Sequence, residues 1–239
     1  MLANQQHPAP QSGSLSQDVH LPATSMHELL DFIAEELPLW RDRSDRPQET
    51  SETNLTSQLC AHLNGAARHS VGWDFLQFKV ETPDETVAGR KIDLVSSPCG
   101  TTVWIEGRRH VEFDTLLPIE CKRLPTPKGK DRDEREYVIS QYSTTGGIQR
   151  FKQGHHGAAH ARCAMIAYVQ DNSRSHWSTC VCQWITDLVE AGQAGWSSKD
   201  TLLVIRNDED RKLTVLSSTH RRANSLPDIE MRHLWVQMN

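Results

Sequence analysis

Two side chains of opposite charge stand two residues apart at the end of an apolar segment. Residues 116–123 read Leu-Leu-Pro-Ile-Glu-Cys-Lys-Arg, a composition that favours a β-strand. Alternate side chains of a strand share a face, so Glu120 and Lys122 project together while Ile119 and Cys121 turn the other way. The sequence therefore predicts a compact site that combines a carboxylate with an ammonium.

A second carboxylate lies inside another apolar strand. Residues 89–95 read Gly-Arg-Lys-Ile-Asp-Leu-Val and place Asp93 among side chains that favour burial. An unpaired charge in such a position is costly, so Asp93 needs a lysine, backbone donors or a cation as its partner. If this strand pairs beside the strand of Glu120, the two carboxylates can bind one divalent ion through oxygen ligands.

A third carboxylate is expected on a helix that precedes both strands. The helix should run from about 51 to 64, and Glu52 shares a face with Leu55 and Leu59, which lie three and seven residues further on. An acid in the first turn is also favoured by the helix dipole alone. Glu52 is thus either a dipole-stabilising residue or a further ligand for a metal or a water, and Glu49 competes for the same place.

Together these residues resemble a known signature. Asp93, followed by Glu120-Cys121-Lys122 and preceded by a helix that carries Glu52, looks like the PD-(D/E)XK (restriction-endonuclease-like) nuclease superfamily. Residues 147–154 and 164–169 also resemble segments of restriction-like proteins from prokaryotic defence loci. The resemblance covers roughly residues 50 to 170, and its motifs are short and degenerate.

The spacing of the two acids departs from the usual pattern. Asp93 and Glu120 are separated by 26 residues, which is long for the family. We expect an extra strand or loop at 102–113 to account for this length. Asp114, six residues before Glu120, is the alternative first aspartate.

The resemblance implies a mechanism in which the carboxylates hold Mg²⁺, with Mn²⁺ as the alternative ion. Asp93, Glu120 and the main-chain carbonyl of Cys121 would be the ligands, and Glu52 would contribute directly or through water. The ion lowers the pKa of a water and neutralises charge on the scissile phosphate. Lys122 would position that water or stabilise the developing charge.

The resemblance also implies a substrate and partners. Either Gln149 or Arg150 would contact the adjacent phosphate, and the substrate would be a nucleic acid, with DNA favoured over RNA. We expect an endonuclease that acts as an effector or subunit of an antiviral defence system. Because a double-strand cut needs two active sites, a homo-oligomer or a partner defence subunit is expected. The alternatives are an RNase of the same fold and a catalytically inactive scaffold or binding subunit.

The pattern of apolar and turn residues predicts the elements that position these side chains. Helical spacing over 25–37 predicts a first helix that Pro38 ends. A helical stretch should begin near 134 and break at Gly146-Gly147, and another should run over 176–191. Strands are expected at about 74–82, 90–96, 102–106, 116–123, 164–169, 202–206, 213–217 and 229–237. This mixture favours an α/β fold with a mixed central β-sheet flanked by helices.

The chain as a whole has the composition of one globular domain with a polar extension. Residues 1–23 are rich in Gln, Ser, Pro and Ala, which is typical of a disordered tail, and residues 24–239 are expected to form a single domain. We find no apolar run long enough to cross a bilayer and no basic-then-apolar leader. The sequence therefore predicts a cytoplasmic protein that does not enter a membrane.

The charge excludes one simple class of nucleic-acid-binding protein. The formal net charge is −5 and the isoelectric point is near 6.2, whereas modules that coat nucleic acid nonspecifically are basic. A nuclease remains compatible with this balance, because metal sites concentrate carboxylates while the surface that faces phosphate is locally basic.

Three further clusters have weaker signals. His155, His156, His160 and Cys163 suggest zinc, yet no second ligand pair at a standard spacing completes a site. The charged loop at 125–136, which carries Lys128, Lys130, Arg132 and Arg135, is either a solvated surface or a contact for phosphate. The basic residues at the end of the segment 217–222 are likewise either a contact for phosphate or part of the solvated surface.

Overall fold

The computed structural model describes residues 24–86, 88–105, 107–142 and 146–239, so the expected tail lies outside the described residues. A seven-stranded sheet has the order β1-β2-β5-β6-β9-β8-β7. Its central strands β5, β6 and β9 are parallel, and the outer neighbours pair antiparallel. The strands are β1 (Leu76–Pro83), β2 (Lys91–Pro98), β5 (Leu117–Leu124), β6 (Arg162–Val169), β7 (Leu203–Asp208), β8 (Leu213–His220) and β9 (Ile229–Gln237). The mixed sheet predicted from the sequence is confirmed.

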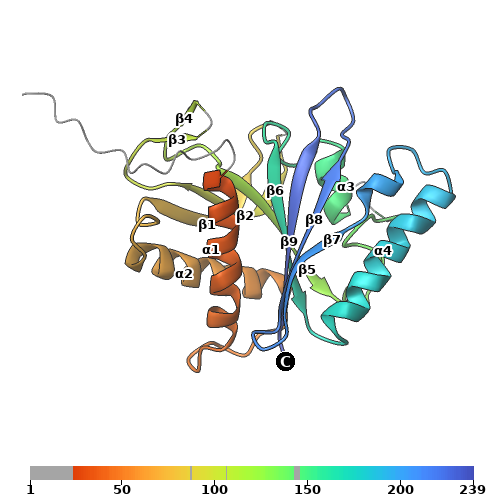
Figure 1. Cartoon of the computed structure of the whole chain (residues 1–239), viewed down its shortest axis with the longest axis horizontal. Coiled ribbons are helices and arrows are strands. Elements are labelled where there is room, and N and C mark those ends of the chain that lie inside the picture. The colour runs from red at the N-terminus through yellow and green to blue at the C-terminus, as the bar shows by residue number, and fades with distance from the viewer. Residues whose placement is uncertain (1–23, 87, 106, 143–145) are drawn as a thin grey trace, which may run out of the picture.

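Helices cover both faces of this sheet. Figure 1 shows α1 (Thr24–Arg41) and α2 (Glu52–His69) on one side, and α3 (Gly147–Lys152) and α4 (Arg174–Glu190) on the other. Strand β6 illustrates the consequence: Ile166 and Tyr168 join the core under α1 and α2, while Met165 joins the core under α3 and α4. A strand buried on both faces must be apolar throughout, which explains the continuous apolar run in the sequence.

Smaller elements complete the chain. Strands β3 (Val103–Ile105) and β4 (Arg108–His110) form a separate hairpin between β2 and β5, where the sequence predicted an extra strand or loop. A short 3-10 helix, η1 (Ser198–Asp200), precedes β7. Among the described helices, none has the length and apolar character needed to span a membrane.

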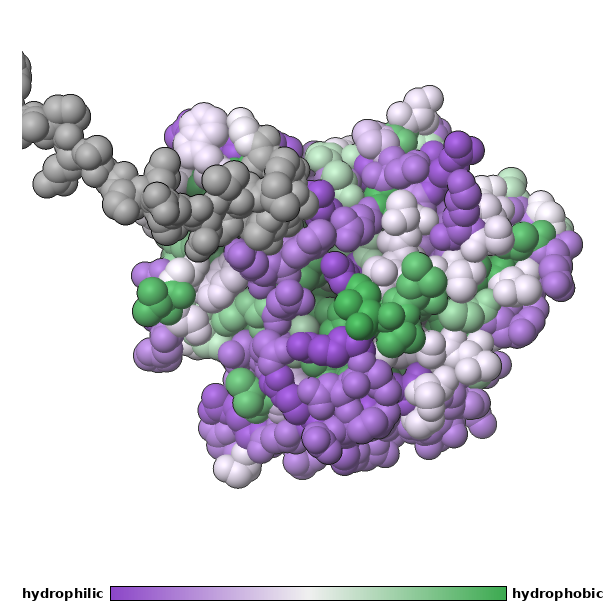
Figure 2. Space-filling view, in the orientation of Figure 1, coloured by the Kyte–Doolittle hydropathy of each residue, from purple (hydrophilic) through white to green (hydrophobic). Residues whose placement is uncertain are grey.

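Strand β7 leaves apolar side chains on the surface. Leu203, Val204 and Ile205 are exposed by 66%, 58% and 49%. Figure 2 shows a green group near the middle of a largely hydrophilic face, where Figure 1 places β7. The strand is at the end of the strand order and has a register irregularity between Val204 and Arg206, a feature that commonly limits pairing at sheet edges.

The structure corrects two of the predictions about helices. Helix α1 continues through Pro38 to Arg41, because Trp40 beyond the proline is buried in the core, and this packing offsets the missing backbone donor. The helical stretch expected from 134 is absent from the described residues of that region, which form turns up to 138. There the Asp133 carboxylate accepts hydrogen bonds from the backbone N–H groups of Arg135 and Gln141, so local side-chain bonds compete with helix formation.

Candidate active site

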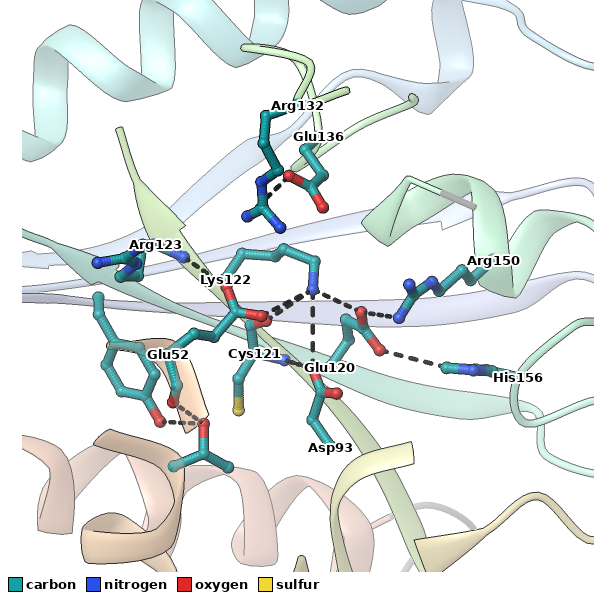
Figure 3. A network of polar contacts seen from close by, with 12 residues as sticks. Glu52, Asp93, Glu120, Cys121, Lys122, Arg123, Arg132, Glu136, Arg150 and His156 are labelled. Carbon is teal, nitrogen blue, oxygen red and sulfur yellow. Dashed lines mark hydrogen bonds and ion pairs between the residues drawn. The ribbon is translucent and has the colours of Figure 1, made fainter. Parts of the chain in front are cut away.

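Strand β5 presents Glu120 and Lys122 on one face, as the sequence predicted. Lys122 Nζ lies 2.7 Å from Glu120 Oε1. Glu120 is fully buried and Lys122 is 5% exposed, so water screens the pair only weakly. Figure 3 shows the lysine chain curling back over the strand toward the carboxylate.

Strand β2 brings Asp93 to the same point. The strands pair antiparallel over Leu94↔Ile119 to Ser96↔Leu117, and beyond this ladder the N–H of Cys121 donates to Asp93 Oδ2 at 2.9 Å. The side chain of Asp93 thus replaces a backbone acceptor for β5. The same oxygen lies 3.8 Å from Lys122 Nζ.

Helix α2 supplies the third carboxylate from its first turn. Ser51 caps the helix by accepting a hydrogen bond from the N–H of Asn54, which fixes the direction in which Glu52 leaves the backbone. Glu52 Oε1 lies 3.2 Å from Lys122 Nζ, and Oε2 accepts from the N–H of Arg123 at 3.2 Å. The structure therefore selects Glu52 as the carboxylate that joins this cluster.

The rival acids lie elsewhere. Glu49 is exposed and accepts a hydrogen bond from the Asn54 side chain. Asp114 lies in the turn that follows β4, where it accepts from the backbone N–H of Val111. Asp93 is consequently the aspartate that faces Glu120.

Two basic residues on the far side of Glu120 were not predicted as its partners. Arg150 Nη1 lies 2.5 Å from Glu120 Oε1, and His156 Nδ1 lies 3.2 Å from Oε2 (Figure 3). Both follow β5 by about thirty residues, and the parallel crossover from β5 to β6 returns them to the strand. Only the basic character of residues 150–156 hinted at this arrangement.

Electrostatics set the protonation states of the central pair. Burial by itself would raise the pKa of Glu120, but Lys122, His156 and Arg150 together hold it well below its ordinary value. Burial would likewise lower the pKa of Lys122, yet the surrounding carboxylates hold it well above its ordinary value. The cluster is therefore built around a carboxylate and an ammonium that both remain charged at neutral pH.

Asp93 is the carboxylate whose charge is least compensated. Burial raises the pKa of Asp93 to about 7, and the negative charge of Glu120 adds to this effect. Lys122 and the N–H of Cys121 act in the opposite direction but do not cancel it. A further cation beside Asp93 would stabilise its ionised form.

A pocket of about 120 Å³ opens beside this carboxylate. It is lined by Glu52 and Asp93 together with Thr56 and Glu81, so solvent and small ions reach the cluster from the side of α2 and β1. The site is thus accessible at Asp93 and Glu52, which are each 27% exposed, and closed at Glu120.

The donor set has the chemistry that a hard divalent cation requires. Carboxylate oxygens of three residues lie 2.7, 3.2 and 3.8 Å from the same nitrogen, and the Cys121 carbonyl lies 2.9 Å from it. Oxygen ligands of this kind suit Mg²⁺. Lys122 Nζ stands at their centre, and within the described residues no group of three or more His, Cys, Asp or Glu side chains is arranged to hold a metal ion as it stands. The residue types fit the ion. For an ion to bind among these oxygen atoms, the Lys122 ammonium would have to move away from their centre.

Other residues from the sequence analysis have different roles. Gln149 turns its side-chain oxygen to the N–H of Gly146 at 3.2 Å, so it is Arg150 of the two neighbours that contacts Glu120. Arg132 pairs with Glu136 at 3.0 Å, and Figure 3 shows this pair apart from the carboxylates, on the side of Lys122 away from Asp93.

The histidines considered for zinc point to separate partners. His156 faces Glu120, whereas His160 Nε2 lies 3.6 Å from Glu85 Oε2. Cys163 donates to the carbonyl of Glu230 at 3.9 Å. These contacts do not converge on one centre.

Comparison with known proteins adds no assignment. No family model, no curated protein and no solved structure matches the chain. The chemistry of the protein is therefore inferred from the geometry of the Lys122 cluster, which we define as Glu52, Asp93, Glu120 and Lys122.

Proposed function

We propose that the protein is a Mg²⁺-dependent nuclease that hydrolyses phosphodiester bonds of DNA. The observation that supports this most directly is the convergence of three carboxylates, from two strands and one helix, within 4 Å of Lys122 Nζ. Gathering three carboxylates, one of them that of the buried Glu120, around a buried lysine is costly for folding, and the grouping resembles the arrangement of acids and lysine in the PD-(D/E)XK superfamily. The restriction-endonuclease-like identity of the fold is part of this proposal.

Each residue of the Lys122 cluster has a role in the proposed reaction. Asp93, Glu120 and the Cys121 carbonyl would hold Mg²⁺ or Mn²⁺, and Glu52 would contribute directly or through water. When bound, the ion supplies charge neutralisation at the phosphate and activation of the attacking water. Lys122 donates hydrogen bonds to the attacking water or to the phosphate oxygens as negative charge develops.

Arg150 and His156 act through Glu120. They contact its oxygens at 2.5 and 3.2 Å and thereby fix the orientation of a carboxylate that Lys122 alone would not hold. Positioning a buried acid by neighbouring donors is a general requirement of metal sites. Arg150 has the further option of reaching the phosphate next to the scissile bond.

The second candidate is a catalytically inactive scaffold or binding subunit. The observation that favours it is the ammonium of Lys122, which already neutralises the carboxylates where an ion would bind. In this reading the cluster stabilises the sheet, and removal of the acids changes stability without affecting any cleavage.

A cleavage assay separates these functions. Plasmid DNA, linear duplex DNA and RNA are incubated with Mg²⁺, with Mn²⁺ and with EDTA, using wild-type protein, Glu120→Ala and Lys122→Ala. We expect cleavage of DNA by the wild type with either ion, none with EDTA, and losses of roughly 10²-fold or more in the variants. If the wild type and the variants cleave equally, the proposal that these residues are catalytic is wrong. If only RNA is cleaved, the proposed substrate is RNA and not DNA.

The biological setting is proposed from the resemblance alone. Residues 147–154 and 164–169 resemble segments of defence-associated proteins, so we propose a cytoplasmic effector or subunit of an antiviral system. A homo-oligomer or a partner subunit would supply the second active site for a double-strand cut. Size-exclusion chromatography with light scattering, with and without duplex DNA, tests the oligomer.

A further inference from the structure

A second pocket lies beside helix α3, away from the carboxylates of the Lys122 cluster. It has a volume of about 430 Å³ and is bounded by α3, by the loop after α4 at 193–196 and by the loop after β8 at 221–223. Arg150 of α3 contacts Glu120, whereas Lys152, two residues further along, lines this pocket. The same short helix thus contributes to both places.

The charged residues that line this pocket are all cationic. Lys152, Arg221 and Arg222 line it, and none of its described lining residues carries a carboxylate. In a chain with a formal net charge of −5, three cations around one cavity form a local exception. Such an exception favours an anionic ligand.

The three cations differ in how far their charge is already compensated. Lys152 is paired with the buried Asp200. The guanidinium of Arg222 donates to the backbone carbonyls of Pro227 and Gly157, which orient it, and its charge also interacts with that of Asp228. Arg221 is exposed at the rim. Arg222 therefore provides a fixed positive charge and Arg221 an adaptable one.

The pocket is also lined by uncharged polar and aromatic residues, which could contact a ligand larger than a simple anion. Gln149, Gln153, Gln193 and Trp196 are among the residues that line the pocket. The buried Oε1 of Gln153 has no hydrogen-bond partner within the part of the chain that the structure describes, although a buried acceptor normally has one. Lys152 Nζ lies 4.9 Å from the centre of the Trp196 ring, which places the aromatic group beside the cations.

We propose that this pocket binds the phosphate group of a nucleotide, with Arg221 and Arg222 on the phosphate. Arginine forks are well matched to phosphate oxygens, while an aromatic ring and amide groups offer contacts to a base. The phosphate belongs either to a polynucleotide or to a free mononucleotide. The proposal stands apart from catalysis, because binding here requires neither a metal nor cleavage.

Binding is measured in EDTA, so that no cleavage occurs. Fluorescence anisotropy follows a labelled DNA duplex over a range of salt concentrations, and calorimetry follows ATP, with inorganic phosphate as a second probe. The variant is Arg221→Glu, because Arg221 is exposed and its replacement leaves the core intact. Arg68→Glu, an exposed arginine at the end of α2, carries the same change of charge outside the pocket. Arg221→Gln serves if the acidic variant fails to fold.

Each result has a definite meaning. If the pocket takes the polynucleotide backbone, Arg221→Glu lowers the slope of log K against log salt by about 1 and weakens duplex binding roughly tenfold. If it takes a free nucleotide, the variant loses ATP binding and keeps duplex binding. Absence of binding to all probes in the wild type, or equal losses in Arg221→Glu and Arg68→Glu, would overturn the proposal. DNA cleavage that is normal in Arg221→Glu leaves the nuclease intact, so the two proposals fail separately.

Discussion

Lys122 Nζ and Glu120 Oε1 lie 2.7 Å apart inside the protein, although their residues are only two positions apart on one strand. Neighbouring side chains on one face of an extended strand normally point away from the backbone in parallel. Here the flexible lysine bends toward the shorter acid, and both are almost completely buried. Removal of either partner would therefore leave a buried charge without its neighbour, which is destabilising whatever the net contribution of the intact pair.

Removal of the ammonium should destabilise the fold. In Lys122→Met the side chain keeps its apolar length, but Glu120 loses the buried ammonium that lies 2.7 Å from its Oε1. We expect the free energy of unfolding to fall by about 3 kcal/mol, which is the lower end for a broken buried pair, because Arg150 and His156 remain beside the carboxylate. Urea denaturation followed by circular dichroism measures this change.

Two further variants control this experiment. Lys130→Met removes an exposed lysine and should change the stability by less than about 0.5 kcal/mol. The double variant Lys122→Met with Glu120→Gln should be more stable than Lys122→Met alone, because the buried side chain that lost its lysine no longer carries a charge. Strict additivity of the two single changes would contradict a direct interaction.

Of the two acids near the start of α2, Glu52 should be needed for activity and Glu49 should not. Glu52→Gln keeps the size of the side chain and removes the negative charge 3.2 Å from Lys122 Nζ. We expect the rate of DNA cleavage at saturating Mg²⁺ to fall by about tenfold or more, in line with the loss of a supporting metal contact. Glu49→Gln is the matched control, because Glu49 is exposed and bonded to Asn54. Equal activities of the two variants would show that Glu52 has only a capping or structural role.

His156 should act as a positioning residue for Glu120. His156→Ala leaves Glu120 Oε2 without the imidazole at 3.2 Å, so the carboxylate is less well oriented and the cleavage rate should fall. His155→Ala, one residue away, is the control. A loss of metal affinity in His156→Ala, measured by Mn²⁺ titration, distinguishes positioning from mere loss of stability, since a purely structural role would lower the melting temperature and leave the affinity of the folded protein unchanged.

A divalent cation should stabilise the folded chain through Asp93. At an ion concentration 100 times the dissociation constant, binding contributes about 2.7 kcal/mol, which corresponds to a rise of roughly 5–10 °C in melting temperature for a domain of this size. Differential scanning calorimetry with Mg²⁺ or Mn²⁺ measures the shift. In Asp93→Asn the shift should be smaller or absent. A wild type that melts at the same temperature with EDTA and with either ion would argue against a metal at this site.

Acid should weaken the protein through two histidines outside the Lys122 cluster. Burial lowers the pKa of His233 well below its ordinary value, and burial also lowers that of His220, against the opposing effect of Asp200. Ser218 bridges the two rings. Because the unfolded chain takes up protons near pH 6.5 while these folded rings resist them, stability is complete above this pH and declines as the pH falls below it.

The size of this effect follows from the number of rings. Well below pH 6.5, each neutral buried histidine costs about 1.4 kcal/mol of stability per pH unit. Urea denaturation between pH 8 and pH 5 should show this decline, and His233→Gln should be less stable at pH 8 but have a shallower pH dependence. An equally steep decline in the variant would assign the effect to other groups.

Several parts of the site could be predicted from the sequence because they depend on local periodicity. The alternation of a strand places Glu120 and Lys122 on one face, and an acid in the apolar segment around Asp93 signals a partnered carboxylate. Helical spacing puts Glu52 on the inward face of α2. These inferences need only the neighbours of each residue along the chain.

Other parts could not be predicted, because they depend on contacts between distant segments. In the sequence Pro38 predicts a helix end, and only the burial of Trp40 in the core explains why α1 continues past it. The choice between Glu52 and Glu49 depends on where Ser51 begins the helix relative to β5. Gln149 and Arg150 are equivalent in the sequence, and only the direction in which α3 packs brings Arg150 to Glu120.

The sequence by itself determined which chemical groups are available and which face of its own element each one occupies, since covalent spacing and the periods of 2 and 3.6 decide that. Only the tertiary structure decided that β2 and β5 are neighbours, that Asp93 accepts from Cys121 and that His156 returns to Glu120. The physical reason is that these contacts join residues 21 to 36 positions apart, where the packing of the whole sheet, and not local preference, selects the partner.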